Sequence, residues 1–137
     1  MNIEDKASLF AQVSRVLRPG GIFGIYDVMR GSEGDLDFPV PWAETRDTSF
    51  VASATTYRQL LEEAGFEILK ERSRREFAIE FFNQLRARIV QAGGPPPLGL
   101  HLLMGPTAPQ KVVNMIDNLE RGLIAPTEIV CRASSRQ

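Results

Sequence analysis

The sequence has few of the residues that hold metals or disulfides. Among its 137 residues are one cysteine, Cys131, and one histidine, His101. A single cysteine cannot form an intrachain disulfide, and no cluster with metal-ligand spacing includes it, so we expect no metal site. No apolar run reaches the ~20 residues of a membrane-spanning helix, and the N-terminus lacks a basic segment followed by an apolar one. We therefore expect a cytoplasmic protein with no membrane partner.

The charge is balanced. Sixteen basic and 17 acidic residues give a formal net charge of −1, so there is no basic surplus to displace counterions from nucleic acid. We expect no nucleic-acid partner. The composition, 43% hydrophobic and 24% charged, is that of a globular protein, and the length allows one domain over residues 1–137. Cys131 lies in a β-branched run, which favours a buried thiol.

The start of the chain contains "RVLRPGGIFGIYDV". Apolar residues at helical spacing predict a helix with Asn2 as its N-cap, and Arg-Pro-Gly-Gly ends that helix. A nearly continuous apolar strand at 22–28 follows, as expected for a strand covered on both faces. Helix, tight turn and buried strand are typical of the second half of a βαβ unit.

The rest of the chain continues the α/β pattern. A helix capped by Ser53 leads through Gly65 into a strand near 66–72. Helices at 77–92 and 109–122 and a last strand near 124–132 complete about four helices and three strands. The loop at 29–53 carries Trp42. We favour packing for its indole, with ligand contact as the alternative.

These segments resemble class I S-adenosylmethionine-dependent methyltransferases. "DKASLFAQVSRVLRPGGIFGIYDV" resembles the helix, turn and fifth strand of that family, and "YRQLLEEAGFEI" resembles its next helix and sixth strand. "FPVPWAE" and "PPPLGLHLLMG" resemble substrate-side elements of small-molecule members such as sarcosine and dimethylglycine methyltransferases. The resemblance implies a partial Rossmann-like fold with a three-stranded mixed sheet, whose last strand lies between the other two and antiparallel to both.

One part of the family pattern is missing. The family binds its cofactor with a glycine-rich turn after the first strand and with an acidic residue that ends the second strand. In this sequence the glycine pair near the start, Gly20 and Gly21, follows a helix and so cannot substitute for that turn. Met1 aligns just after the family's fourth strand. We therefore expect a truncated, acceptor-side half of a methyltransferase that is inactive alone and binds no cofactor, although the full-length family uses S-adenosylmethionine. The alternative is a non-catalytic small-molecule-binding or oligomeric assembly module.

The resemblance also implies site residues. It places Met1 and Asn2 at the methionine end of the cofactor, and it assigns no catalytic residue. The substrate pocket it implies comprises Tyr26, Asp27, Trp42, His101 and Met104. For Asp27 the alternative is a hydrogen bond that fixes the strand exit, and for His101 it is a core position.

The strand at 22–28 would lack a neighbour in such a half. Its unpaired backbone groups, with parts of Leu9, Phe10 and Val13 exposed, predict a homodimer through residues 1–28. A small-molecule ligand in the substrate pocket is the other candidate partner.

Overall fold

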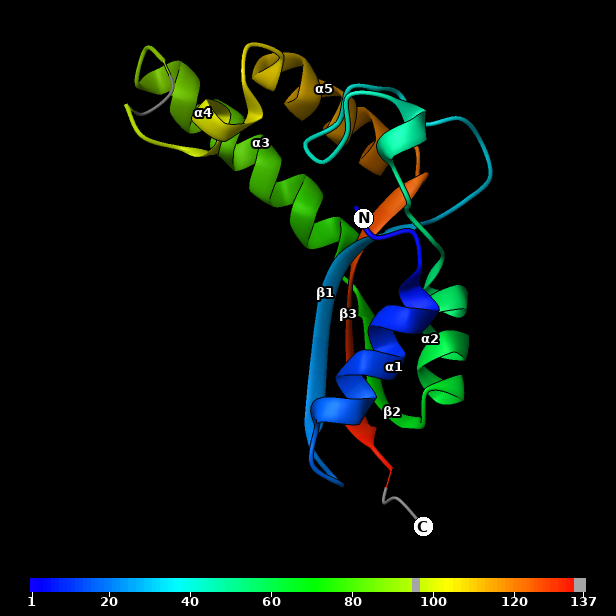
Figure 1. Cartoon of the computed structure of the whole chain (residues 1–137). Helices are drawn as coiled ribbons and strands as arrows, with labels where there is room; N and C mark the ends of the chain where they lie inside the picture. The colour runs from blue at the N-terminus through cyan, green and yellow to red at the C-terminus, as the bar shows by residue number, and fades with distance from the viewer. Residues whose placement is uncertain (95–96, 135–137) are drawn as a thin grey trace.

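The computed structural model describes residues 1–94 and 97–134, which form an α/β domain (Figure 1). Along the chain come α1 (Lys6–Val16), β1 (Ile22–Arg30), the short 3-10 helix η1 (Arg46–Thr48), α2 (Ala54–Glu63), β2 (Phe66–Ser73), α3 (Arg75–Gln91), α4 (Leu100–Met104), α5 (Ala108–Glu120) and β3 (Ile124–Ala133). No helix in these two described ranges has the length and apolarity needed to cross a bilayer.

The sheet confirms the predicted strands and their order. β3 lies between β1 and β2 and pairs antiparallel with both, with Ile129 opposite Ile25 on one side and Glu71 on the other. β1 and β2 therefore point the same way but do not touch. Both pairs are antiparallel, as predicted for β3, so the described sheet is an antiparallel one, whereas the sequence analysis calls it mixed.

Two helix predictions need correction. The first helix begins at Lys6 because Asp5, not Asn2, is its N-cap: the Ser8 N–H donates to Asp5 Oδ1 at 2.9 Å. The apolar segment around His101 forms the short helix α4, which makes five α-helices in the described chain instead of about four. The predicted cap at Ser53 is confirmed, because its hydroxyl accepts from the Thr56 N–H.

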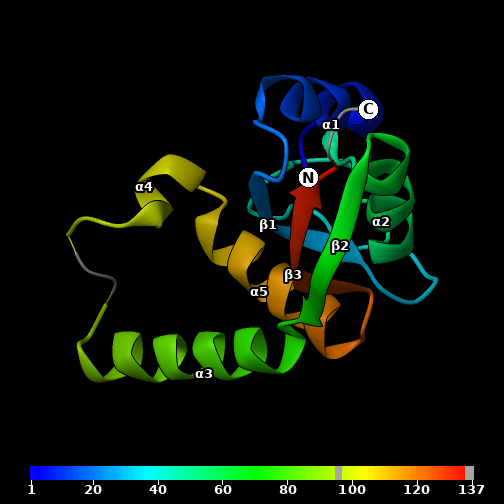
Figure 2. The ribbon, with the colours of Figure 1, turned by 90° about the horizontal axis from the view of Figure 1, so that it is seen from below.

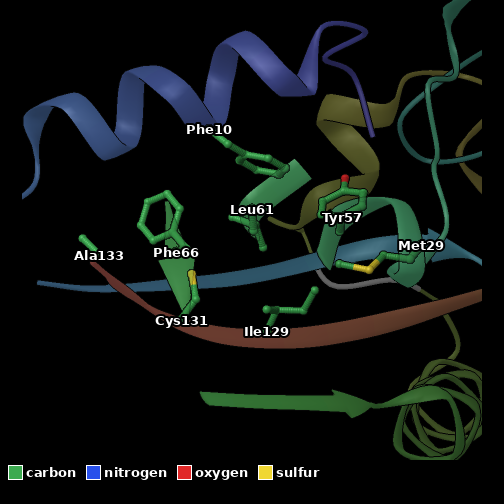
Figure 3. Packing of buried hydrophobic residues seen from close by; sticks show 8 residues of the cluster. All are labelled: Phe10, Met29, Tyr57, Leu61, Phe66, Ile129, Cys131 and Ala133. Atoms are coloured by element: carbon green, nitrogen blue, oxygen red, sulfur yellow. The ribbon is translucent and has the colours of Figure 1, made fainter. Parts of the chain in front are cut away.

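Helices α1 and α2 cover one face of the sheet (Figure 1). The main core lies between these two helices and the sheet. Figure 3 labels its side chains: Phe10, Met29, Tyr57, Leu61, Phe66, Ile129, Cys131 and Ala133. Phe10 is only 2% exposed, and its ring lies 5.7 Å from that of Tyr57. The expectation that Phe10 would be left exposed is therefore wrong, because α2 and the sheet enclose it. Cys131 is fully buried, as expected.

The opposite face is covered only in part. Helices α3 and α5 pack over the end of the sheet where β1 finishes and β3 begins, around a second cluster of Val28, Ala78, Met115, Leu119 and Ile124. Figure 2 shows α3 extending away from the sheet. Nearer the start of β1, Ile22 is 55% exposed and Tyr26 is 61% exposed. No described helix covers these two side chains.

Candidate functional site

The site is centred on Asp27, close to the end of β1. Its carboxylate accepts hydrogen bonds from three groups: the Tyr57 hydroxyl, the Met1 amine at 2.9 Å and the Val28 N–H at 3.0 Å. The side chain keeps 17% of its surface exposed. Strand β1 thus presents a carboxylate that is held on the covered side of the sheet but still reaches solvent.

Tyr57 and Lys6 shape the electrostatics around this carboxylate. Burial, and then the hydrogen bond to Asp27, raise the pKa of Tyr57 well above its usual value, so Tyr57 stays a donor. Burial lowers the pKa of Lys6, and the Asp27 charge opposes that effect. The Lys6 Nζ donates to the Ile3 carbonyl at 2.7 Å and to the Phe50 carbonyl. Lys6 therefore fixes the first residues and the long loop beside Tyr57.

Two pockets meet at Asp27. One, of about 240 Å³, lies between α1 and β1 and is lined by Lys6, Phe10 and Tyr57. The other, which we call the α3 pocket, measures about 350 Å³. It is lined by Met1, Tyr26, Asp27, Val28, Phe77, Ala78, Phe81, Phe82, Met115 and Pro126. Met1 and Asp27 line both pockets, so the two pockets border the same part of β1, and the Asp27 carboxylate lies on the side of the first pocket, next to Tyr57.

A further hollow lies in the loop after β1 and is lined by Arg30, Asp35, Arg46 and neighbouring loop residues. Its charges are satisfied within the loop: Arg46 donates to Asp35 at 3.1 Å, and Arg30 donates to the Gly34 carbonyl. These contacts account for the charged side chains that line the hollow, so the charges do not indicate a ligand-binding site.

The structure brings some predicted site residues together. Met1, Tyr26 and Asp27 all line the α3 pocket. Asn2 lies beside them in the chain, and its side-chain amide donates to the Trp42 carbonyl at 2.7 Å. Trp42 packs against the second cluster, and its Nε1 donates to the Ser49 hydroxyl at 2.9 Å. These contacts are the packing that we favour for the Trp42 indole. The assignment of Trp42 to a substrate pocket stays a prediction.

His101 and Met104 lie elsewhere, on α4, which packs against α5. Neither residue lines the pockets at Asp27. The Met104 carbonyl accepts from Lys111 Nζ at 2.9 Å, and Lys111 also pairs with Glu44. Lys111 thereby ties α4 to the long loop. The assignment of His101 and Met104 to a substrate pocket also stays a prediction.

The sequence analysis missed the aromatic wall of the α3 pocket. Phe77 and Phe81 stack with ring centres 6.4 Å apart, and Phe82 meets Phe81 edge-on at 5.5 Å. A signal was present, because phenylalanines at spacing four make an unusually aromatic helix face. Spacing alone does not show that Phe77 and Phe81 remain 54% and 45% exposed.

The described residues do not fit S-adenosylmethionine by themselves. None of the strands in 1–94 and 97–134 leads through a glycine-rich turn directly into a helix. Gly31 follows β1, but a Cβ there would lie 2.2 Å from the Gly122 carbonyl oxygen, so close packing accounts for that glycine. In the same loop, Asp37 pairs with Arg121. Within the described chain, no group of acids, histidine and cysteine is placed to hold a metal ion.

Comparison with known proteins gives a match in structure. No family model matches the sequence, and no curated protein matches it. A candidate sarcosine dimethylglycine methyltransferase from Galdieria sulphuraria superposes with a TM-score of 0.72 at 21% identity, over 98% of this chain and 49% of the other. Phosphoethanolamine N-methyltransferase 2 of Haemonchus contortus gives 0.72 at 14% identity, over 98% and 31%.

The match is not limited to methyltransferases. The [4+2]-cyclase SpnF gives a TM-score of 0.59 at 22% identity, over 96% of this chain and 45% of that one. The chain thus spans less than half the length of each of these three structures. At such identities the likeness establishes the fold and not the reaction. The chain has part of the fold found in S-adenosylmethionine-dependent methyltransferases.

Proposed function

We propose that this chain is the acceptor-side half of a small-molecule methyltransferase and is inactive until a further polypeptide segment completes it. The observation that carries this proposal is the position of Asp27. It lies close to the end of a β-strand and lines two pockets, in a partial methyltransferase fold. Ligands of open α/β sheets bind outside the carboxyl ends of the strands.

In the completed protein, S-adenosylmethionine supplies the methyl group and is held by the added segment. This half binds and orients the acceptor, which is the main demand of a displacement at a methyl carbon. The walls of the α3 pocket exclude water, and Asp27 accepts a hydrogen bond from the acceptor. Tyr57 and Val28 donate to that carboxylate and hold it in place.

The test uses the chain alone and a chimera. The chimera joins to residue 1 the part of the Galdieria protein that this chain does not match. Calorimetry should show no S-adenosylhomocysteine binding by the chain alone and micromolar binding by the chimera. With a panel of amines, alcohols and acids, the chimera should release S-adenosylhomocysteine, and Asp27→Asn in the chimera should slow that release.

Two outcomes would overturn the proposal. Micromolar binding of S-adenosylhomocysteine by the 137-residue chain would show that it needs no further segment. A chimera that binds S-adenosylhomocysteine but methylates nothing in the panel, while the chain still binds small molecules, would favour a non-catalytic binding module.

For the chain by itself we also propose a two-fold homodimer through residues 1–28. Within the described sheet, β1 pairs with β3 along one edge. Along its other edge the described residues form an isolated bridge between Arg30 and Ser53, so the part of that edge before Arg30 carries unpaired backbone groups. Three apolar side chains within residues 1–28 are exposed: Ile3 by 48%, Val16 by 67% and Ile22 by 55%. Because the completing segment would use the same edge, adding it should dissociate the dimer.

A further inference from the structure

We propose that the α3 pocket binds the uncharged, apolar body of a small molecule, such as a substituted aromatic ring, and leaves the polar group of that molecule outside. This inference rests on the proposed function in one respect, namely that the α3 pocket receives the acceptor. It adds the chemical class of the acceptor, which the fold does not specify.

The alternation of side chains along β1 determines which groups face the pocket. Val28 packs in the second cluster with α3 and α5, whereas Phe23 and Ile25 pack in the main core beneath α1 and α2. Asp27 shares the face of Phe23 and Ile25, and its carboxylate accepts from the Tyr57 hydroxyl there. The carboxylate is therefore not offered to a ligand in the α3 pocket. None of the other described residues that line the pocket has a charged side chain.

The walls of the pocket are apolar. Three aromatic rings come from α3: Phe77, Phe81 and Phe82. Val28 of β1 and Met115 of α5 also line the pocket and belong to the second cluster. Because Phe77 and Phe81 are about half exposed, a ligand in the pocket would withdraw apolar surface from water, and this drives binding. The volume of about 350 Å³ is within the range of small-molecule sites.

A polar group of the ligand finds partners only at the mouth of the pocket, its solvent-exposed rim. Besides Asp27, Tyr26 is the one described lining residue whose side chain carries a nitrogen or oxygen atom. Tyr26 is 61% exposed, and no described residue bonds to its hydroxyl. Water and this hydroxyl can therefore satisfy a polar group at the mouth. A polar group placed between Phe81 and Met115 would lose its hydrogen bonds to water without replacement.

The size of the pocket favours a small molecule over a polypeptide segment. A helix is about 10 Å wide and rises about 5.4 Å per turn, so one turn occupies roughly 400 Å³. That is more than the whole pocket holds. An added strand would need free main-chain groups, but β1 and β3 are paired with each other along the pocket, where Val28 lies opposite Pro126. A substituted ring meets neither obstacle.

The experiment titrates the purified chain with three probes that share a 2-phenylethanol frame and differ in the group para to its arm: methyl, hydroxyl or carboxylate. Methyl and hydroxyl groups are nearly equal in size, so their comparison isolates polarity. Methyl NMR signals of Ala78 and Met115, which line the pocket, report binding. We expect the methyl probe to bind most tightly, the hydroxyl probe at least tenfold more weakly, and the carboxylate probe more weakly again. A hydroxyl or carboxylate probe that binds as tightly as the methyl probe, or three probes that leave both signals unmoved, would overturn the inference.

Variants locate the effect on α3. Phe81→Ala should weaken the methyl probe several-fold, and Phe81→Leu, which keeps an apolar wall, should retain most of the affinity. Val90→Ala, at an 80% exposed position of the same helix and outside the lining, is the control and should change nothing. Because Phe81 is 45% exposed, both of its variants should fold, and the amide spectrum checks this. Equal losses at positions 81 and 90 would contradict the assignment.

The chimera with the Galdieria segment tests the occupant in the completed protein. If the methyl probe shifts the same two signals there, the pocket is open to a small molecule, as proposed. Loss of that binding in the chimera would show that the added segment covers the pocket, and would overturn the inference.

These titrations need no cofactor and no turnover, so they fail separately from the proposed function. A chimera that binds the methyl probe but transfers no methyl group would sustain this inference and overturn the proposed function. A chimera that methylates an acceptor but does not bind the probe would do the opposite.

Discussion

The two faces of strand β1 differ sharply in what they contact. On one face, Phe23 and Ile25 pack into the core beneath α1 and α2. On the other, Ile22 and Tyr26 alternate with them and stay mostly exposed. Because side chains alternate along a strand, one nine-residue segment contributes to a closed core and to an open surface.

The comparison separates stability from binding. The covered face holds the closely packed rings and the fully buried thiol. The open face holds exposed apolar side chains, the aromatic wall of the α3 pocket and a set of ion pairs. The former should determine whether the chain folds, and the latter should determine what it binds. Matched substitutions on the two faces test this division.

The largest expected effect is at the covered face. Leu61 on α2 is fully buried, so Leu61→Ala should lower the free energy of unfolding by about 2–5 kcal/mol. Ile22 on the open face of β1 is 55% exposed, so Ile22→Ala should cost less than about 1 kcal/mol. Urea denaturation followed by circular dichroism measures both. Equal losses would show that the two faces do not differ in packing.

The next effect concerns the open edge and the proposed dimer. Light scattering at tens of micromolar should give twice the chain mass. Ile22→Lys places a charge on the exposed start of β1 and should weaken association at least tenfold, which is about 1.4 kcal/mol. Val90→Lys, at an 80% exposed position on α3, is the control and should leave the mass unchanged. A wild-type chain of monomer mass would rule the dimer out.

Much of the fold follows from local signals. Gly65 has a left-handed φ of 84°, as an exit from α2 requires, and the strand after it forms where the apolar pattern places it. The central position of β3 comes instead from the family resemblance, because no local feature of that strand specifies its neighbours.

The site was less predictable, for physical reasons. Asp5 and Asn2 are both good capping residues, and only the structure shows that Asp5 caps α1 while Asn2 donates to the Trp42 carbonyl. The continuous apolar run at 22–28 predicts two covered faces, yet the described helices cover one of them fully. The exposure of Phe77 and Phe81 depends on how far α3 extends beyond the sheet, which periodicity does not encode.

A third prediction uses the buried thiol of the covered face. Burial raises the pKa of Cys131 to about 11, whereas an unfolded thiol ionises near pH 8.5. Between these values the unfolded chain releases a proton that the folded chain keeps, so the free energy of unfolding should fall as pH rises from about 9 to 11. Cys131→Ala should be less stable throughout but should lose part of this slope. Urea midpoints at pH 7.5, 9 and 10 measure it, and parallel curves for the two proteins would contradict it.

Tyr57 acts in the same direction at higher pH, since its raised pKa makes the folded chain hold a proton that the unfolded chain releases near pH 10. The comparison of Cys131→Ala with wild type should therefore be read below pH 10. Above that value, Tyr57→Phe becomes the second variant that reduces the slope.

The smallest effect should come from the ion pairs on the open face. Glu128 accepts from Arg72 at 2.9 Å and lies 3.2 Å from the Lys70 Nζ. Hydrogen bonds from Arg72 and Lys70 lower the pKa of Glu128, so their contribution is present above about pH 4.3 and is lost as pH falls through the lowered value. Because solvent and salt screen such exposed pairs, Glu128→Gln should leave the urea midpoint at pH 7 within error. At pH 3–4 the same variant should show a smaller decline than wild type, because Asp5 and Glu44, whose pKa values are also lowered, still contribute. A midpoint shift at pH 7 as large as that of Leu61→Ala would show that the open face also makes a large contribution to stability.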